Sequence, residues 1–152
     1  MSNIDVRIDT GRIEAFVSEL EEANKDKAIR GGLLRGAKVL ERVGRMNLRQ
    51  RNNEHTGNLM KSMRAKLARR QLKAYAGFER SYRLNLEKGV GNHAHLVDKG
   101  TVERYTKKGS YRGIMPASYF WEDTKQNSTN EVRRAIGEGV EEYVRRLTEK
   151  YA

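Results

Sequence analysis

Apolar and polar residues alternate with a helical period over two long stretches of the chain. The first runs from about Asn24 to Arg49, and the second from about Ser118 almost to the C-terminus. In each stretch the apolar positions fall on one face of a helix, which predicts two long amphipathic helices, with a bend in the second near residues 126–130. The first stripe contains Ile29, Leu33, Ala37, Leu40 and Val43, and the second contains Phe120, Thr124, Val132, Ile136, Val140, Val144, Leu147 and Tyr151.

Four glycines interrupt the first of these predicted helices. In a helix interior each glycine costs about 1 kcal/mol relative to alanine, so helix propensity alone argues against a helix here. Missing side chains let a second backbone approach closely, and Gly137 and Gly139 in the second helix are natural partners. We therefore expect the two helices to pack through some of these positions. The four glycines are Gly31, Gly32, Gly36 and Gly44.

Strict alternation of apolar and polar residues predicts a β-hairpin in the middle of the chain. Residues 63–67 and 72–78 each place their apolar side chains on one face, and residues 69–71 between them have hairpin-loop length. Residues 82–86 alternate again, and residues 4–8 do so ahead of a short amphipathic segment. The sequence therefore predicts the hairpin plus one or two further strands and a short N-terminal helix.

The stretch from Lys88 to Gly113 is rich in Gly, Lys, Tyr and Thr and predicts a long loop before the C-terminal helix. The expected fold is α+β, with a small antiparallel sheet packed against two long helices. A chain of 152 residues fits one domain, so we assign residues 1–152 to a single domain.

The net charge of +11 is concentrated in the middle of the chain. Twelve Lys and Arg residues lie between Arg42 and Arg83, against two Glu residues. Such a block attracts polyanions over roughly 10 Å at moderate salt, although a solvated basic face or a match to an acidic partner protein explains it equally well. The candidate patch on the predicted hairpin, facing a DNA channel or an acidic partner, consists of Arg64, Lys66, Arg69, Arg70 and Lys73.

Candidate enzyme chemistry is weakly supported by the sequence. There is no cysteine, no Gly-x-Ser-x-Gly elbow and no phosphate-binding glycine loop, and the histidines His55, His93 and His95 lack a zinc-protease motif. A histidine-dependent metalloenzyme is therefore the least favoured interpretation, and we expect no catalytic residue, metal or cofactor. Residues 1–30 lack an apolar run of signal-peptide length, and no stretch is long and apolar enough to span a membrane.

Three short segments resemble motifs of a known family when taken in order. Thr56-Gly57-Asn58-Leu59 with Lys61-Ser62-Met63 is similar to a Thr-Gly-x-Leu-x-x-Ser-Ile stretch. His95 to Thr101 resembles an element that ends in Gly-Thr, although Asp98 replaces the usual glutamate and Lys99 a common aromatic residue. Pro116-Ala117 with Tyr119-Phe120 resembles a Pro-Ala-x-Pro-Phe sequence whose second proline is absent here. Together they resemble the gene-product-ten family of HK-type siphophages, over about Ala28 to Val132.

This resemblance implies a tail-completion or head–tail joining protein of a tailed phage or prophage. Such a protein is a structural part of the virion neck, made in the host cytoplasm and assembled as a ring, expected to be a hexamer. Its implied partners are further copies of itself, connector or stopper proteins and tail-tube or tail-terminator proteins, with transient contact to packaged DNA and none to membranes. The alternatives are a tail-terminator or minor tail protein, or a basic, sequence-nonspecific DNA-binding domain of a mobile element.

The residues of the three segments, together with those of the loop between the second and third segments, divide into two expected roles. One group lies in the predicted long loop and is expected to contact other subunits during assembly: His95, Asp98, Thr101, Tyr105 and Tyr111. The other group forms turns and anchors that specify the fold: Thr56, Gly57, Leu59, Gly100, Pro116, Phe120 and Trp121.

Overall fold

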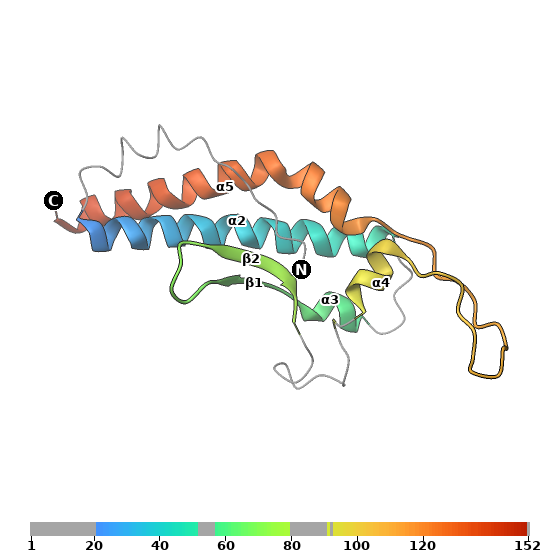
Figure 1. Cartoon of the computed structure of the whole chain (residues 1–152). Coiled ribbons are helices and arrows are strands. Elements are labelled where there is room, and N and C mark those ends of the chain that lie inside the picture. The colour runs from blue at the N-terminus through green and yellow to red at the C-terminus, as the bar shows by residue number, and fades with distance from the viewer. Residues whose placement is uncertain (1–20, 52–56, 80–90, 92, 152) are drawn as a thin grey trace. The chain divides into compact units, whose positions relative to one another are not determined.

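Two long helices packed on a small two-stranded antiparallel sheet form the α+β fold of this protein, as predicted. The computed structural model describes residues 21–51, 57–79, 91 and 93–151 (Figure 1). The predicted strand at residues 4–8, the helix that follows it and the third strand at 82–86 lie outside these residues. The elements are α2 (Glu22–Arg51), α3 (Asn58–Ser62), β1 (Met63–Leu67), β2 (Ala74–Phe78), α4 (Ala94–Lys99) and α5 (Phe120–Tyr151).

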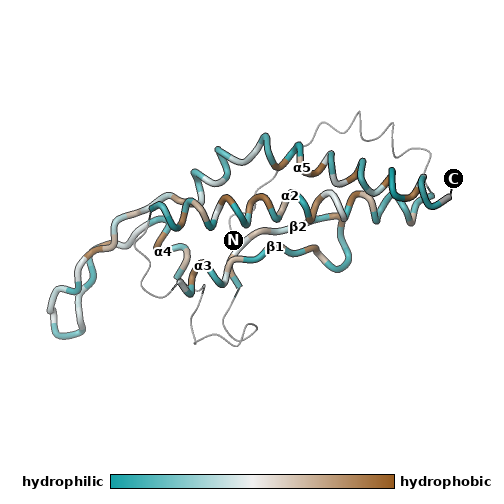
Figure 2. Tube along the Cα trace, turned by 180° about the vertical axis from the view of Figure 1, so that it is seen from behind, coloured by the Kyte–Doolittle hydropathy of each residue, from teal (hydrophilic) through white to brown (hydrophobic). Residues whose placement is uncertain are grey.

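Both long helices have nearly the predicted bounds. The first was expected to begin at Asn24 and forms Glu22–Arg51, and the second was expected from about Ser118 and forms Phe120–Tyr151. α5 is helical through residues 126–130, where a bend was expected. Figure 2 shows hydrophobic positions recurring along both helices between hydrophilic ones. The apolar stripes were therefore a sufficient signal for these two elements.

The described residues divide into two compact units, to which the long helices both contribute. Unit 1 comprises described residues among 1–42, 64–77 and 125–152, and unit 2 comprises those among 43–63 and 78–124. The assignment of the whole chain to one domain stays a prediction. No helix among the described residues is long and apolar enough to cross a membrane.

The core of unit 1 is formed by the apolar stripes of α2 and α5. Leu40 packs with Val132 and Ile136, and Ala76 of β2 covers this cluster. A second cluster joins Ala28 to Val140 and Val144. Burying an aliphatic side chain of this size contributes about 1.5–3 kcal/mol, so these contacts are the main source of stability between the helices. The remaining partly buried members of the two clusters are Leu33, Val39 and Tyr143.

The predicted glycine contact between the helices is present at some positions and absent at others. A Cβ on Gly139 would lie 2.8 Å from the Cα of Gly32, and a Cβ on Gly36 would lie 2.6 Å from Cγ1 of Ile136. Side chains added at Gly31 or Gly137 would meet no described residue within 4 Å. The prediction of close packing is therefore confirmed at Gly32, Gly36 and Gly139, and no such contact is present at Gly31 or Gly137 among the described residues.

The hairpin forms with a longer turn than predicted. Bends occupy residues 69–72, and the Ala68 amide donates a hydrogen bond to the Lys73 carbonyl (2.9 Å). Leu72, predicted to begin the second strand, lies in this turn and is 43% exposed. The second strand begins later than the alternation pattern predicted, because the turn that closes a hairpin determines the register of its strands.

The region predicted as one long loop contains two ordered elements. Residues 94–99 form α4, so His95 and Asp98 lie on a helix and not in a loop, and His93 precedes it. Residues 101–115 form a second hairpin, the arm, in which the Thr101 amide donates to the Met115 carbonyl (2.9 Å) and the Arg112 amide donates to the Arg104 carbonyl (2.6 Å). The predicted loop before the C-terminal helix is therefore present, and residues 94–99 are the part of it that is helical.

Candidate functional site

The first of the three segments forms α3, a single short helix. Gly57 precedes it with a φ of 63°, a left-handed conformation that glycine adopts without steric cost. Thr56, which was expected to specify the fold here, lies outside the described residues, and the N-cap is Gly57. Ser62 Oγ donates to the Leu59 carbonyl (2.7 Å). Gly57 and Leu59 therefore have the turn and helix roles that the sequence predicted.

The second segment supports the start of α5 inside unit 2. Asp98 accepts a hydrogen bond from the Trp121 amide (2.9 Å), one of the amides at the helix N-terminus that has no partner within the helix. The Asp98 carbonyl accepts a further bond from the Tyr119 amide (2.9 Å). A carboxylate at this end also interacts favourably with the helix dipole. The Asp98 side chain thus positions α5, and its predicted assembly contact stays a prediction.

Gly100 and Thr101 form the corner that the sequence predicted. Gly100 has a φ of 75°, and a Cβ there would lie 2.7 Å from the Met115 carbonyl oxygen. Thr101 pairs with Met115 through its backbone, and its Oγ1 accepts a hydrogen bond from the Met115 amide (3.0 Å). The corner therefore requires glycine, and Thr101 closes the base of the arm.

The third segment anchors α5 through aromatic packing. Phe120 is fully buried, and its ring lies 5.8 Å from that of Phe78 in an edge-to-face arrangement. The Trp121 ring lies 6.1 Å from the same Phe78 ring. Phe78 is the last residue of β2, so the predicted anchoring of the last helix to the sheet is confirmed. Pro116 is exposed in the stretch leading to this helix.

The arm exposes aromatic and aliphatic side chains to solvent. Tyr105 and Tyr111 face each other across an isolated antiparallel bridge, with ring centroids 5.5 Å apart, and each is 57% exposed. Val102 is 81% exposed and Ile114 57% exposed. The arm is thus held by its own backbone bonds while its apolar side chains have little cover, which is typical of a surface that a partner covers.

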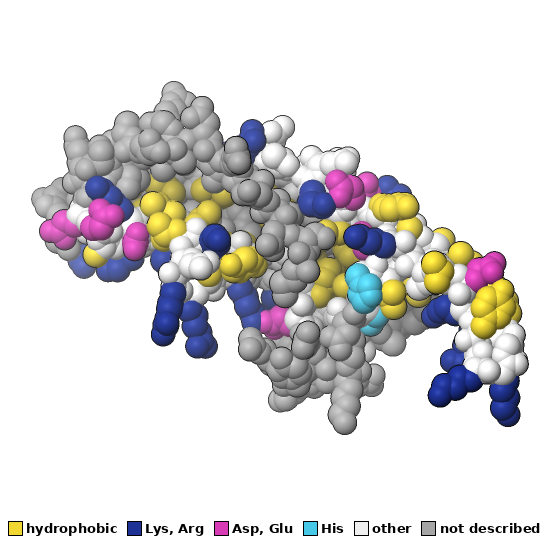
Figure 3. Space-filling model, viewed as in Figure 1, with side chains coloured by type: hydrophobic (Ala, Val, Ile, Leu, Met, Phe, Trp, Pro, Cys, Tyr) yellow, Lys and Arg dark blue, Asp and Glu magenta, His cyan; other side chains and the backbone are white. Residues whose placement is uncertain are grey.

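A second exposed surface, the basic turn, lies between β1 and β2. Lys66, Arg69, Arg70 and Lys73 are exposed, while Arg64 is half-buried on β1. Figure 3 shows Lys and Arg side chains projecting at this turn and at the tip of the arm. The structure therefore brings together the basic residues that the sequence grouped, with Arg64 the least exposed of them.

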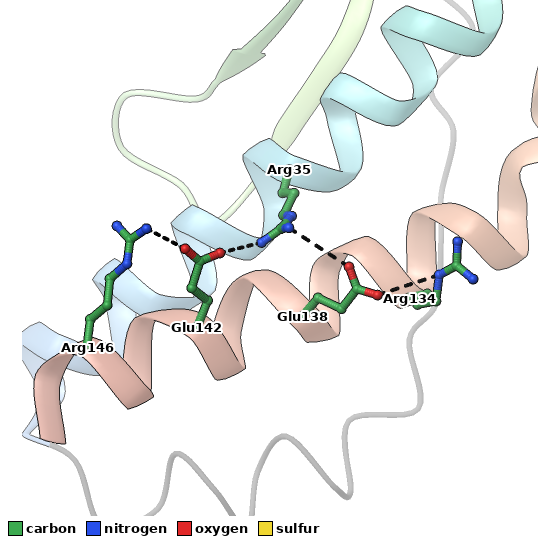
Figure 4. Close-up of polar contacts among 5 residues, drawn as sticks. All are labelled: Arg35, Arg134, Glu138, Glu142 and Arg146. Carbon is green, nitrogen blue, oxygen red and sulfur yellow. Dashed lines mark hydrogen bonds and ion pairs between the residues drawn. The ribbon is translucent and has the colours of Figure 1, made fainter. Parts of the chain in front are cut away.

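Ion pairs between α2 and α5 were not predicted from the sequence. Arg35 of α2 contacts Glu142 of α5 (2.6 Å), and Glu142 also pairs with Arg146 (Figure 4). The hydrogen bond from Arg35 and the charge of Arg146 lower the pKa of Glu142 below its usual range. The two residues of an ion pair between α2 and α5 are far apart in sequence, so no local pattern predicts which charges meet. The sequence indicates only that both helices carry opposite charges on their polar faces.

The histidines do not form a metal site in the described part of the chain. His93 and His95 are exposed beside and on α4, and His55 lies outside the described residues. The described residues contain no group of three or more His, Cys, Asp or Glu side chains placed to hold a metal ion. Residues 94–99 are helical, so His95 lies on α4 and His93 is its N-cap residue.

Comparison with protein-family models, with curated proteins and with solved structures finds no match for this chain.

Proposed function

We propose that this chain is a structural protein of a tailed phage or prophage, which joins or completes the tail at the head–tail interface. The observation that carries the proposal is the arm at residues 101–115, with its exposed side chains, which lies between the second and third of the motifs that resemble a neck family. Exposed apolar side chains on a hydrogen-bonded hairpin are costly in an isolated protein and favourable when a partner covers them.

The proposed assembly is a ring of identical chains, expected to be a hexamer. A closed ring requires head-to-tail contacts between different surfaces of neighbouring subunits, and a projecting arm suits such a contact. The further partners are a connector or stopper protein on one side and a tail-tube or tail-terminator protein on the other. The role is structural rather than enzymatic, with no cofactor, and its place is the virion neck after synthesis in the host cytoplasm.

The decisive experiment removes the gene from the phage or prophage that encodes the chain. We expect electron microscopy to show DNA-filled heads and separate tails of normal length, with joining restored by the wild-type gene. Overlong tails would instead indicate a tail terminator, and intact infectious particles would refute a neck role. Capsid and tail genes beside this one would support the proposal, and their absence would contradict it.

The arm itself is tested by complementation with Tyr111→Thr. This variant removes an exposed ring from the arm, so we expect the protein to remain folded but to restore fewer joined particles. Tyr75→Thr is the matched control, because Tyr75 is 44% exposed on β2 and lies outside the arm. Equal complementation by both variants would show that the arm is not an assembly surface.

A further inference from the structure

The basic turn concentrates positive charge in a short stretch of sequence. Residues 63–78 include five Lys or Arg and no Asp or Glu. Among the described residues, Arg69, Arg70 and Lys73 form no ion pair. The long helices differ, since Arg35 and Arg51 pair with Glu142 and Asp123. Within the part of the chain that the structure describes, the charge of Arg69, Arg70 and Lys73 is therefore available to an external polyanion.

Arg30 of α2 holds the turn in one conformation. Its Nη2 donates a hydrogen bond to the Ala68 carbonyl (2.9 Å), and its Nη1 donates to the Gln71 carbonyl (3.3 Å). The Ala68 amide in turn donates to the Lys73 carbonyl. One planar guanidinium thus bridges two carbonyls of the turn, which reduces the ordering cost of binding to a ligand.

We propose that the basic turn binds the sugar–phosphate backbone of duplex DNA without reading its sequence. Arg69, Arg70 and Lys73 contact phosphates, and Arg30 is a positioning residue. A guanidinium matches the geometry of phosphate oxygens, and contacts to phosphates carry no sequence information. This inference names a partner for the proposed assembly protein and rests on that function only for its biological setting.

Duplex DNA fits this surface better than an acidic protein does. A protein interface has an apolar centre surrounded by polar residues. Between Arg69 and Lys73 the only apolar side chain is Leu72, so charge dominates the turn. A narrow two-stranded β-ribbon also fits a DNA groove, which brings the residues at its end close to the phosphates.

The binding test uses the full chain and a labelled mixed-sequence duplex, with fluorescence polarisation at several salt concentrations. Neutralising about three phosphates gives a slope of log K against log salt near −3, since each phosphate contributes about 0.9. We expect the double variant Arg69→Gln/Arg70→Gln to make this slope less steep by about 2. A wild-type protein without salt-dependent binding would overturn the proposal.

The matched control is Lys107→Gln/Lys108→Gln at the exposed tip of the arm, which removes the same charge elsewhere. We expect this control to leave the salt slope unchanged. An equal effect of both double variants would overturn the assignment of the basic turn as the binding site, because it would show attraction by net charge alone. Polyglutamate that displaces the duplex at equal charge concentration would overturn the choice of DNA in favour of an acidic polypeptide.

Arg30→Lys tests positioning, because it keeps the charge and removes the guanidinium that bridges the Ala68 and Gln71 carbonyls. We expect affinity to fall several-fold with the salt slope unchanged, whereas unchanged affinity would refute the positioning role. Failure of these binding tests would leave the assembly proposal intact, because particle morphology decides that proposal. Conversely, intact particles without the chain would refute assembly and leave the binding result valid.

Discussion

α2 and α5 approach closely in unit 1 at Gly32, which has no side chain. A Cβ on Gly32 would lie 2.6 Å from the Ile136 carbonyl oxygen and 2.8 Å from Cγ2 of Val140. A Cβ on the neighbouring Gly31 would meet nothing within 4 Å among the residues that the structure describes. The variants Gly32→Ala and Gly31→Ala therefore make the same chemical change one residue apart, with and without a steric conflict.

The expected free energies have opposite signs. Replacing glycine by alanine in a helix interior stabilises the helix by about 1 kcal/mol at either position. Gly32→Ala also inserts a methyl group against a backbone carbonyl that cannot rotate away, and overpacking of this kind typically costs about 1–3 kcal/mol. Gly31→Ala should thus raise the free energy of unfolding by about 1 kcal/mol. The free energy of unfolding of Gly32→Ala should be about 1–3 kcal/mol lower than that of Gly31→Ala.

Urea denaturation followed by far-ultraviolet circular dichroism measures both variants against the wild type. The difference between the two variants isolates the steric cost, because the gain in helix propensity is common to both. Equal dependence of their unfolding free energies on urea is required, so that the midpoints report stability and not a changed unfolded state. If Gly32→Ala proves as stable as Gly31→Ala, the close approach of the helices at this position is refuted.

Two further predictions concern a cap and a pH dependence. Asp98→Ala removes the acceptor of the Trp121 amide, so we expect a loss of about 1 kcal/mol in urea denaturation followed by Trp121 fluorescence, and wild-type stability would contradict the cap. The pKa of Glu142 is lowered by Arg35 and Arg146, so its stabilising effect is present above the unfolded-state pKa and is lost as the pH falls through the folded-state pKa. Glu142→Gln should therefore be less stable than the wild type at neutral pH and similar to it in acid, and a pH-independent difference would refute this.

The elements recovered from the sequence are those whose signal is local and repeated. α2 and α5 carry apolar stripes over many turns, so their existence and approximate bounds were predictable. The hairpin was recovered for the same reason, although Leu72 was placed in a strand. Leu72 is apolar and therefore fitted the alternation of the second strand. The alternation of apolar and polar residues does not show where the turn is closed, which is decided by the hydrogen bond between Ala68 and Lys73.

α4 was missed because a helix of six residues has too few turns to show a period. Helices this short are unstable alone in water and depend on contacts elsewhere in the protein. Here Ser118 Oγ and the Ser118 amide donate to the Val97 carbonyl, and the Tyr119 amide donates to the Asp98 carbonyl. These donors lie about twenty residues later in the chain, so the sequence near α4 does not indicate the hydrogen bonds that stabilise it.

The candidate surfaces also have features that the sequence predicts and features that depend on the tertiary structure. The sequence by itself determined the charge of the basic turn and the aromatic content of the arm, because both depend only on residue type. Only the tertiary structure decided that Arg30 holds the turn, that Asp98 serves the start of α5, and that Gly32 rather than Gly31 faces the other helix. These features join residues distant in sequence, and a side chain's partner across such a distance depends on how the helices and turns pack.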